Sequence, residues 1–215
     1  MGIDANIVGG IREIGGAKAD AKKPILLEII IAPSFSKEAL EILTTKKNLR
    51  LLEVNMDRGG VCERQLVSVN GGLLVQDLDT DTKTVTEDMT VTKKRPTASE
   101  LADMSFGWRI VKHVKSNAIL VVKNGCTVGV GAGQMNRVGS AEIALCEAKA
   151  KGLTEDLVLA SDGFLPFDDT VTLAAGYGVK AIVQPGGSIH DNDSIVKADE
   201  LGVAMAFTGE RHFKH

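Results

Sequence analysis

Hydrophobic and polar positions near the start of the chain predict a strand, a helix and a second strand. Apolar residues dominate positions 25–32, which is typical of a buried strand, and Pro33 ends the run. Ser36 is placed to cap a helix through position 47, and apolar residues return at 51–54. Because the helix crosses over between the two strands, they are predicted to pair in parallel.

Two Asn-Gly pairs predict tight hairpins. Residues 65–77 alternate around Asn70-Gly71, and apolar runs at 118–122 and 127–130 flank Asn124-Gly125. Asn-Gly is the strongest short signal for a two-residue hairpin turn, because both central residues must adopt positive φ. Antiparallel pairs are therefore expected beside the parallel one.

The remaining pattern predicts a layered protein of alternating helices and strands. The Thr-rich stretch 79–95 is interpreted as a surface connection, and Thr97 with Glu100 forms a capping box. Trp108 falls on the apolar face of the helix that follows, which favours a core position over ligand stacking. Further helices are expected at 140–151, 169–176 and 192–201, and strands at 157–160, 181–184 and 204–208. The expected fold class is α/β with a layered mixed sheet.

Composition narrows the classes of function. The chain has 215 residues, of which 44% are hydrophobic and 25% charged, as in a globular protein with a sizeable core. A net charge of −3 gives no bulk reason to expect nucleic acid or anionic membrane as a partner. We find no signal peptide and no apolar run that spans a bilayer. Cys62, Cys126 and Cys146 favour reduced thiols in a cytoplasmic protein, and without C-x-x-C or His-x-Glu no metal site is expected.

Candidate binding groups lie in loops that follow strands, where layered α/β proteins tend to bind ligands. The first loop joins Lys115-Ser116-Asn117 to the glycine-rich segment 129–137, which ends in the cation Arg137. Its glycines permit a close backbone approach to a ligand, and a purely conformational role is an equal alternative. The second loop, 161–169, holds two phenylalanines that either plug the end of the sheet or stack on a planar heterocycle. In the second case Asp162 or Asp169 is the polar contact.

The third loop and the C-terminal segment also carry binding-competent groups. Backbone amides at 184–188 are placed to hold an anion or a carbonyl oxygen, whereas Asp191 and Asp193 point to ordinary helix capping. The segment 211–215 holds two histidines, an arginine, a lysine and a phenylalanine, which are either solvated or functional.

Taken in order, these motifs resemble AICAR transformylase. The likeness runs from about Ile29 to the end of the chain, on segments 69–77, 114–119, 129–137, 161–169, 182–188 and 211–215. It implies residues 1–27 as a poorly matched lead-in and 28–215 as the C-terminal domain of the transformylase, with a cytidine-deaminase-like fold. Family members usually carry IMP cyclohydrolase ahead of the transformylase.

The resemblance also implies a reaction and its partners. The family moves a formyl group from 10-formyltetrahydrofolate to the amine of aminoimidazole carboxamide ribonucleotide, without a metal, at sites shared across a homodimer. Contacts to the ribonucleotide are implied for Asn117, as the catalytic residue, and for Arg137, Phe164, Arg211 and Phe213. The folate side is implied for Val138, Asp169, Gly187 and Ser188.

Two departures from the family pattern qualify the hypothesis. Asp168 stands where the family has an arginine, so the charge at that position is reversed. The family's Lys-His pair, which includes the proton acceptor, lies in its upstream half and has no match here, because Lys112-His113 and Lys214-His215 occur in other contexts. We therefore expect the binding half of a formyl-transfer site. The alternatives are a non-catalytic binding or oligomerisation module and, least favoured, a zinc deaminase.

Overall fold

A computed structural model describes residues 28–54, 64–81 and 83–214 of the chain. Its internal contacts divide the protein into two units, 1–77 and 78–215, which are treated separately below. The predicted lead-in, 1–27, lies outside the described residues, and the predicted domain 28–215 stays a prediction.

The first unit begins with the predicted strand–helix–strand arrangement. Strand β1 (Ile29–Ala32) precedes helix α2 (Lys37–Leu43) in the chain, and strand β2 (Arg50–Glu53) follows it. The two strands pair in parallel. The Ser36 hydroxyl accepts a hydrogen bond from the Ala39 amide at 3.1 Å, as an N-cap does. The cap and the parallel pair were both predicted correctly.

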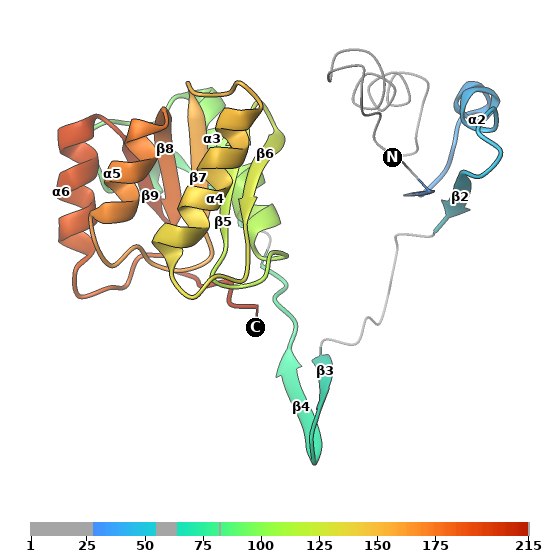
Figure 1. Cartoon of the computed structure of the whole chain (residues 1–215), viewed down its shortest axis with the longest axis horizontal. Coiled ribbons are helices and arrows are strands. Elements are labelled where there is room, and N and C mark those ends of the chain that lie inside the picture. The colour runs from blue at the N-terminus through green and yellow to red at the C-terminus, as the bar shows by residue number, and fades with distance from the viewer. Residues whose placement is uncertain (1–27, 55–63, 82, 215) are drawn as a thin grey trace. The chain divides into compact units, whose positions relative to one another are not determined.

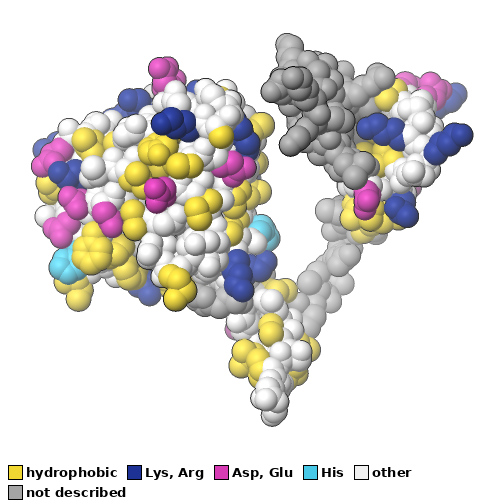
Figure 2. Space-filling view, in the orientation of Figure 1, with side chains coloured by type: hydrophobic (Ala, Val, Ile, Leu, Met, Phe, Trp, Pro, Cys, Tyr) yellow, Lys and Arg dark blue, Asp and Glu magenta, His cyan; other side chains and the backbone are white. Residues whose placement is uncertain are grey.

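The first unit ends in a hairpin with apolar side chains on both faces. Strands β3 (Arg64–Val69) and β4 (Gly72–Asp77) pair around Asn70-Gly71, and Gly71 has a φ of +82°. Leu66 lies opposite Val75 on one face and Val67 opposite Leu74 on the other, and all four are exposed. Figure 2 shows apolar side chains at the surface of the hairpin. Isolated two-stranded hairpins are marginally stable in water, so the exposed apolar area favours a partner surface.

The second unit is built on a five-stranded mixed sheet in the order β6-β5-β7-β8-β9. The strands are β5 (Ile119–Lys123), β6 (Cys126–Gly131), β7 (Leu157–Ser161), β8 (Val179–Gln184) and β9 (Ala204–Phe207). β5 is antiparallel to both β6 and β7, whereas β7, β8 and β9 run parallel. The predicted α/β class and mixed sheet are confirmed.

Helices cover both faces of this sheet (Figure 1). Helix α3 (Ala98–Val111) packs on one face, and α4 (Arg137–Ala150), α5 (Asp169–Gly176) and α6 (Asp191–Leu201) pack on the other. Alternate residues of β5 point to opposite layers, Leu120 toward α3 and Val121 toward α4, which follows from the two-residue period of a strand. Trp108 is 1% exposed, so its predicted core position is confirmed.

The stretch 79–95 is more than the predicted surface connection. It contains a short 3-10 helix, η1 (Glu87–Met89), and Val85 is buried against the α3 layer. The Val91 amide donates to the Met205 carbonyl of β9 at 2.9 Å. β9 is the last strand of the sheet, and its outer backbone groups need partners, so this stretch covers the edge.

Two glycines that were candidates for close approach to a ligand instead allow β6 to lie against α4. A Cβ at Gly129 would overlap the Ala144 carbonyl, and one at Gly131 would overlap the Ser140 carbonyl. We expect Gly131→Ala to lower the free energy of unfolding by about 1–3 kcal/mol, because backbone must move to admit the methyl group. Denaturant titration checks this. Gly176→Ala is the control, since no atom lies within 4 Å of its Cβ position, and an equal loss in both variants would contradict the packing argument.

Candidate functional site

The three candidate loops and the C-terminal segment meet at one edge of the sheet. This edge is formed by the ends of the strands and is not the lateral edge along β9. The start of β5 lies beside the ends of β6 and β7, because Ile119 pairs with both Gly131 and Ser161. β8 and β9 run parallel to β7 and end at the same edge. Segments far apart in the sequence are brought together there.

A buried carboxylate, Asp162, lies at the centre of this edge. Its side chain is 0% exposed, and its two oxygens have different partners. Oδ1 accepts from Nη2 of Arg137 at 3.0 Å, and Oδ2 accepts from the Ser116 hydroxyl at 2.5 Å. Asp162 was considered as a ligand contact in the sequence, but in the structure it anchors Arg137.

The C-terminal segment, 211–214, has no regular secondary structure and is hydrogen-bonded to this anchor. The His212 amide donates to the Asp162 carbonyl, the Ser116 amide donates to the Lys214 carbonyl, and the Lys214 amide donates to the Ser116 hydroxyl, each at 2.9 Å. His212 is buried, whereas its neighbours Arg211 and Phe213 are exposed. The last residues are therefore an ordered part of the edge.

Two cationic side chains and two aromatic rings lie together on the exposed side. The Arg211 guanidinium carbon lies 4.9 Å from the ring centroid of Phe164 and 5.9 Å from that of Phe213. Arg137 lies 5.7 Å from the Phe213 ring, within the range of a cation–π contact. Nε of Arg137 is buried without a hydrogen-bond partner. Two cationic side chains beside two aromatic rings suit a planar ligand that also carries negative charge.

The third loop reaches this cluster through Gly187. A Cβ at Gly187 would lie 3.7 Å from Nη2 of Arg211. The amides of Gly187 and Ser188 donate to the two carboxylate oxygens of Asp191, at 2.7 and 3.1 Å. In this structure the chain's own carboxylate occupies the amides that were candidates for an anion or carbonyl.

Asn117 and Val138 lie beside the first turn of α4. The Asn117 carboxamide nitrogen donates to the Gln134 carbonyl at 2.8 Å, and the Asn117 carbonyl accepts from the Ser140 hydroxyl at 2.7 Å. Val138 is the second residue of α4 and half-buried, directly after Arg137. Both residues therefore lie next to the cluster. The carboxamide of Asn117 donates within the first candidate loop, to Gln134, rather than toward the cluster.

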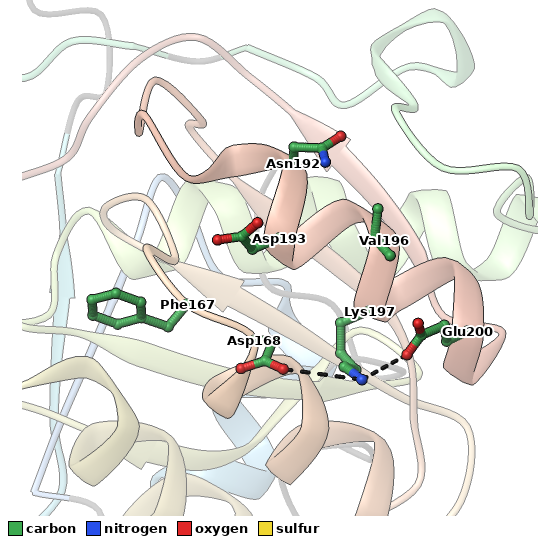
Figure 3. A pocket seen from close by; sticks show the side chains of 7 residues that line it. All are labelled: Phe167, Asp168, Asn192, Asp193, Val196, Lys197 and Glu200. Atoms are coloured by element: carbon green, nitrogen blue, oxygen red, sulfur yellow. Dashed lines mark hydrogen bonds and ion pairs between the residues drawn. The ribbon is translucent and has the colours of Figure 1, made fainter.

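Asp169 is the first residue of α5, directly after the N-cap residue Asp168. The Asp169 carboxylate accepts from the Thr170 amide at 2.6 Å and faces solvent. Beside it, a hollow of about 410 Å³ opens between the start of α5 and helix α6 (Figure 3). Lys197 lies there between Asp168, 4.0 Å away, and Glu200, 2.6 Å away, and its hydrogen bond to Glu200 raises the pKa of the ammonium group. Asp168, where the charge is reversed relative to the family pattern, thus has a cationic neighbour in Lys197. The residues that line the hollow do not include the cluster of two arginines and two phenylalanines.

Comparison with known proteins identifies the family. The family model described as AICARFT/IMPCHase bienzyme matches residues 5–147. The chain belongs to this family. It is 54% identical over all of its length to the bifunctional purine biosynthesis protein PurH of Bacillus cytotoxicus, and 56% identical over 98% of its length to PurH of Bacillus subtilis. The first of these matches also covers the predicted lead-in.

The bienzyme relatives are considerably longer than this chain. It spans 42% of the Bacillus cytotoxicus protein and 41% of the Bacillus subtilis protein. A solved deaminase/reductase from Thermotoga maritima is similar over 49% of the chain, at 17% identity and a TM-score of 0.35. Purine biosynthesis is named for these longer relatives, of which this chain corresponds to one portion.

Within residues 28–54, 64–81 and 83–214, no helix is both long and apolar enough to cross a membrane. No three histidine, cysteine or acidic side chains among them gather closely enough to bind a metal ion.

The burial of one residue at this edge, His212, was not predicted from the sequence. His212 is 2% exposed, with Nδ1 2.5 Å from Asp79 and Nε2 3.6 Å from Asp81. Its ring centroid lies 4.2 Å from that of Trp108, whose indole Nε1 donates to Asp81 at 3.1 Å. The sequence singled out His212 only as one of the binding-competent groups of segment 211–215, and no local pattern predicted that its ring is buried.

Asp81 gives this contact a pH dependence. Burial acts to raise the pKa of Asp81, but hydrogen bonds from Lys83 and Trp108 and the charges of His212 and Lys83 outweigh it and lower the pKa below 3.8. A lowered pKa contributes stability above the unfolded-state value and loses it as the pH falls through the folded-state value. We expect the free energy of unfolding to fall below about pH 4.

Asp81→Asn is expected to flatten this acid dependence. The measurement is denaturant unfolding at several pH values between about 2 and 6. The control is Asp88→Asn, because Asp88 is exposed in η1. If Asp81→Asn and the original chain lose stability in parallel as the pH falls, the Asp81 argument is wrong.

Proposed function

We propose that this chain is the C-terminal portion of the transformylase part of the bienzyme, with the deaminase-like version of the layered fold. Its function is to bind aminoimidazole carboxamide ribonucleotide and 10-formyltetrahydrofolate during formyl transfer. The observation that supports this most directly is the cluster of Arg137, Arg211, Phe164 and Phe213. These four come from three separate segments, and all were expected to contact the ribonucleotide.

Each member of the cluster has a role in this proposal. Arg137 and Arg211 hold the phosphate and carboxamide of the ribonucleotide, while Phe164 and Phe213 set the plane of the imidazole ring. Arg137 is suited to hold a ligand in one position, because its guanidinium is itself held by the buried Asp162. Positioning matters here, since the attacking amine is conjugated with its ring and is a weak nucleophile.

In the reaction, the amine nitrogen attacks the formyl carbon, and the bond from that carbon to the folate nitrogen then breaks. The amine loses a proton to a general base, and the folate nitrogen gains one. Asn117 stabilises the tetrahedral oxyanion, for which its carboxamide must exchange the Gln134 carbonyl for the substrate. The Lys-His pair that supplies the base belongs to a part of the family pattern without a match in this chain.

The folate side is formed by Val138, Asp169, Gly187 and Ser188, next to the ribonucleotide cluster. The proximity of Gly187 to Arg211 supports this placement. The proposal includes a homodimer, in which a second copy contributes to each site as in the family.

A second candidate is an oligomerisation module of the same fold without catalysis. The exposed apolar residues on both faces of the β3–β4 hairpin favour it. Solution mass measured by light scattering at several concentrations tests association separately from binding.

Calorimetric titration tests the binding proposal. We expect the chain to bind the ribonucleotide and the folate, and ribose 5-phosphate, which lacks the imidazole, to bind more weakly. A formyl-transfer assay should give little turnover, because the general base is missing. Absence of binding to both ligands would contradict the proposal, and turnover at the rate of a full-length relative would contradict the missing base.

A further inference from the structure

The C-terminal segment, 211–214, places two site residues on one side and a single buried residue on the other. Burial alternates along its first three residues, which are exposed, buried and exposed in turn. Arg211 and Phe213 face the cluster with Phe164 and Arg137, and His212 between them points into the protein. Of the side chains at 211–214, only that of His212 is buried.

His212 enters a polar recess formed by two distant segments. Asp79 and Asp81 contribute one wall, and Trp108 of α3 contributes the other, with the indole donating to Asp81. The ammonium group of Lys112 holds the acidic wall in place through the carbonyls of Asp79, at 3.2 Å, and Asp81, at 2.5 Å. The acidic wall is thus held by contacts that do not involve His212, and its two carboxylates favour a ring that donates hydrogen bonds.

The backbone hydrogen bonds of the segment do not depend on which residue types it contains. The bonds to Asp162 and Ser116 involve the amides of 212 and 214 and the carbonyl of 214, which other residue types also provide. Lys214 adds an exposed side-chain contact to the His113 carbonyl at 3.3 Å, so His212 supplies the buried side-chain contact among residues 211–214.

We propose that His212 is a positioning residue of the ribonucleotide site. By docking against Asp79, Asp81 and Trp108, it fixes the register of the last residues, and so places Arg211 and Phe213 against the ligand. The expected effect on ribonucleotide binding rests on the proposed function, whereas the docking of His212 against Asp79, Asp81 and Trp108 does not.

His212→Leu tests the proposal, because leucine retains apolar volume but removes both ring nitrogens. We expect the Kd for the ribonucleotide to rise about 10-fold or more, since Arg211 and Phe213 are no longer held. His212→Asn returns a donor at the position of Nδ1 and is expected to restore most of the affinity. Asp79→Ala should resemble His212→Leu without altering the core, and the control Asp88→Ala, on an exposed carboxylate, should bind like the original chain.

Two readouts report docking without any ligand. Trp108 is the one tryptophan of the chain, so its emission reports the recess directly. His212→Leu and Asp79→Ala should shift the emission to longer wavelength and increase acrylamide quenching, and trypsin should cut faster after Arg211. His212→Asn and Asp88→Ala should keep the original emission and cleavage rate.

The outcomes separate this proposal from the proposed function. If the original chain binds no ribonucleotide, the proposed function fails, and the fluorescence and cleavage results still decide whether His212 docks the segment. If His212→Leu leaves emission, cleavage and affinity unchanged, the positioning role is overturned. Equal loss of affinity in His212→Leu and His212→Asn, with equal melting temperatures, would overturn it as well.

Discussion

Replacing Gly163 with alanine is expected to weaken ribonucleotide binding about 10- to 100-fold. A Cβ at Gly163 would overlap Nη2 of Arg137 and lie 2.8 Å from Cε1 of Phe213, so both side chains must leave their positions. Hydrogen bonds to charged groups contribute about 1.5–3 kcal/mol, and losing one such contact corresponds to this range of affinity. Calorimetric titration with the ribonucleotide measures the change.

The control for Gly163→Ala is again Gly176→Ala, which adds the same methyl group to open space at the end of α5. It should bind the ribonucleotide with the original affinity. If Gly163→Ala also binds normally, neither Arg137 nor Phe213 contacts the ligand as proposed. Because Gly163 does not itself touch the ligand in this proposal, the experiment tests the cluster rather than the loop.

Replacing Asp162 with asparagine should lower the free energy of unfolding by about 3 kcal/mol. Removing one partner of a buried ion pair typically costs about 3–5 kcal/mol, because the remaining charge is left in a poorly solvated position. The Arg137 side chain retains 14% exposure, which places the expected loss at the lower end. Urea denaturation at neutral pH measures it.

Glu200→Gln is the matched comparison for Asp162→Asn. Glu200 also pairs with a cationic side chain, Lys197, but the Glu200 carboxylate is 56% exposed and the Lys197 side chain 29% exposed, so solvent reaches both groups. Solvent screens such pairs, so the free energy of unfolding should change little. If the two substitutions have similar effects, Asp162 is not the buried anchor that the structure indicates.

Local signals in the sequence were sufficient for most of the elements. Asn124-Gly125 formed the predicted hairpin between β5 and β6, and Thr97 with Glu100 formed the predicted capping box of α3. Helix 169–176 was predicted with its observed bounds. These features depend on contacts between residues a few positions apart, and such contacts can be read from spacing.

The sequence was less informative about which groups lie inside. The stretch 79–95 looked polar throughout, yet it covers the edge strand β9 and contributes Asp79 and Asp81 to the recess for His212. The glycines at 129 and 131 looked suited to a ligand, and they accommodate a helix. The first two features depend on partners far along the chain, and the glycines depend on how the next helix, α4, packs back on β6. No local pattern identifies either kind of contact.

The sequence by itself determined the α/β class, the order of the elements, the family resemblance and the candidate residues of the site. These follow from short-range periodicity and from motif identity, which the order of residues contains directly. The tertiary structure decided that Arg137, Phe164, Arg211 and Phe213 share one edge of the sheet, with Asp162 and His212 buried beneath them. His212 and Asp79 are 133 residues apart, and only the folding of the sheet brings such groups within hydrogen-bonding distance.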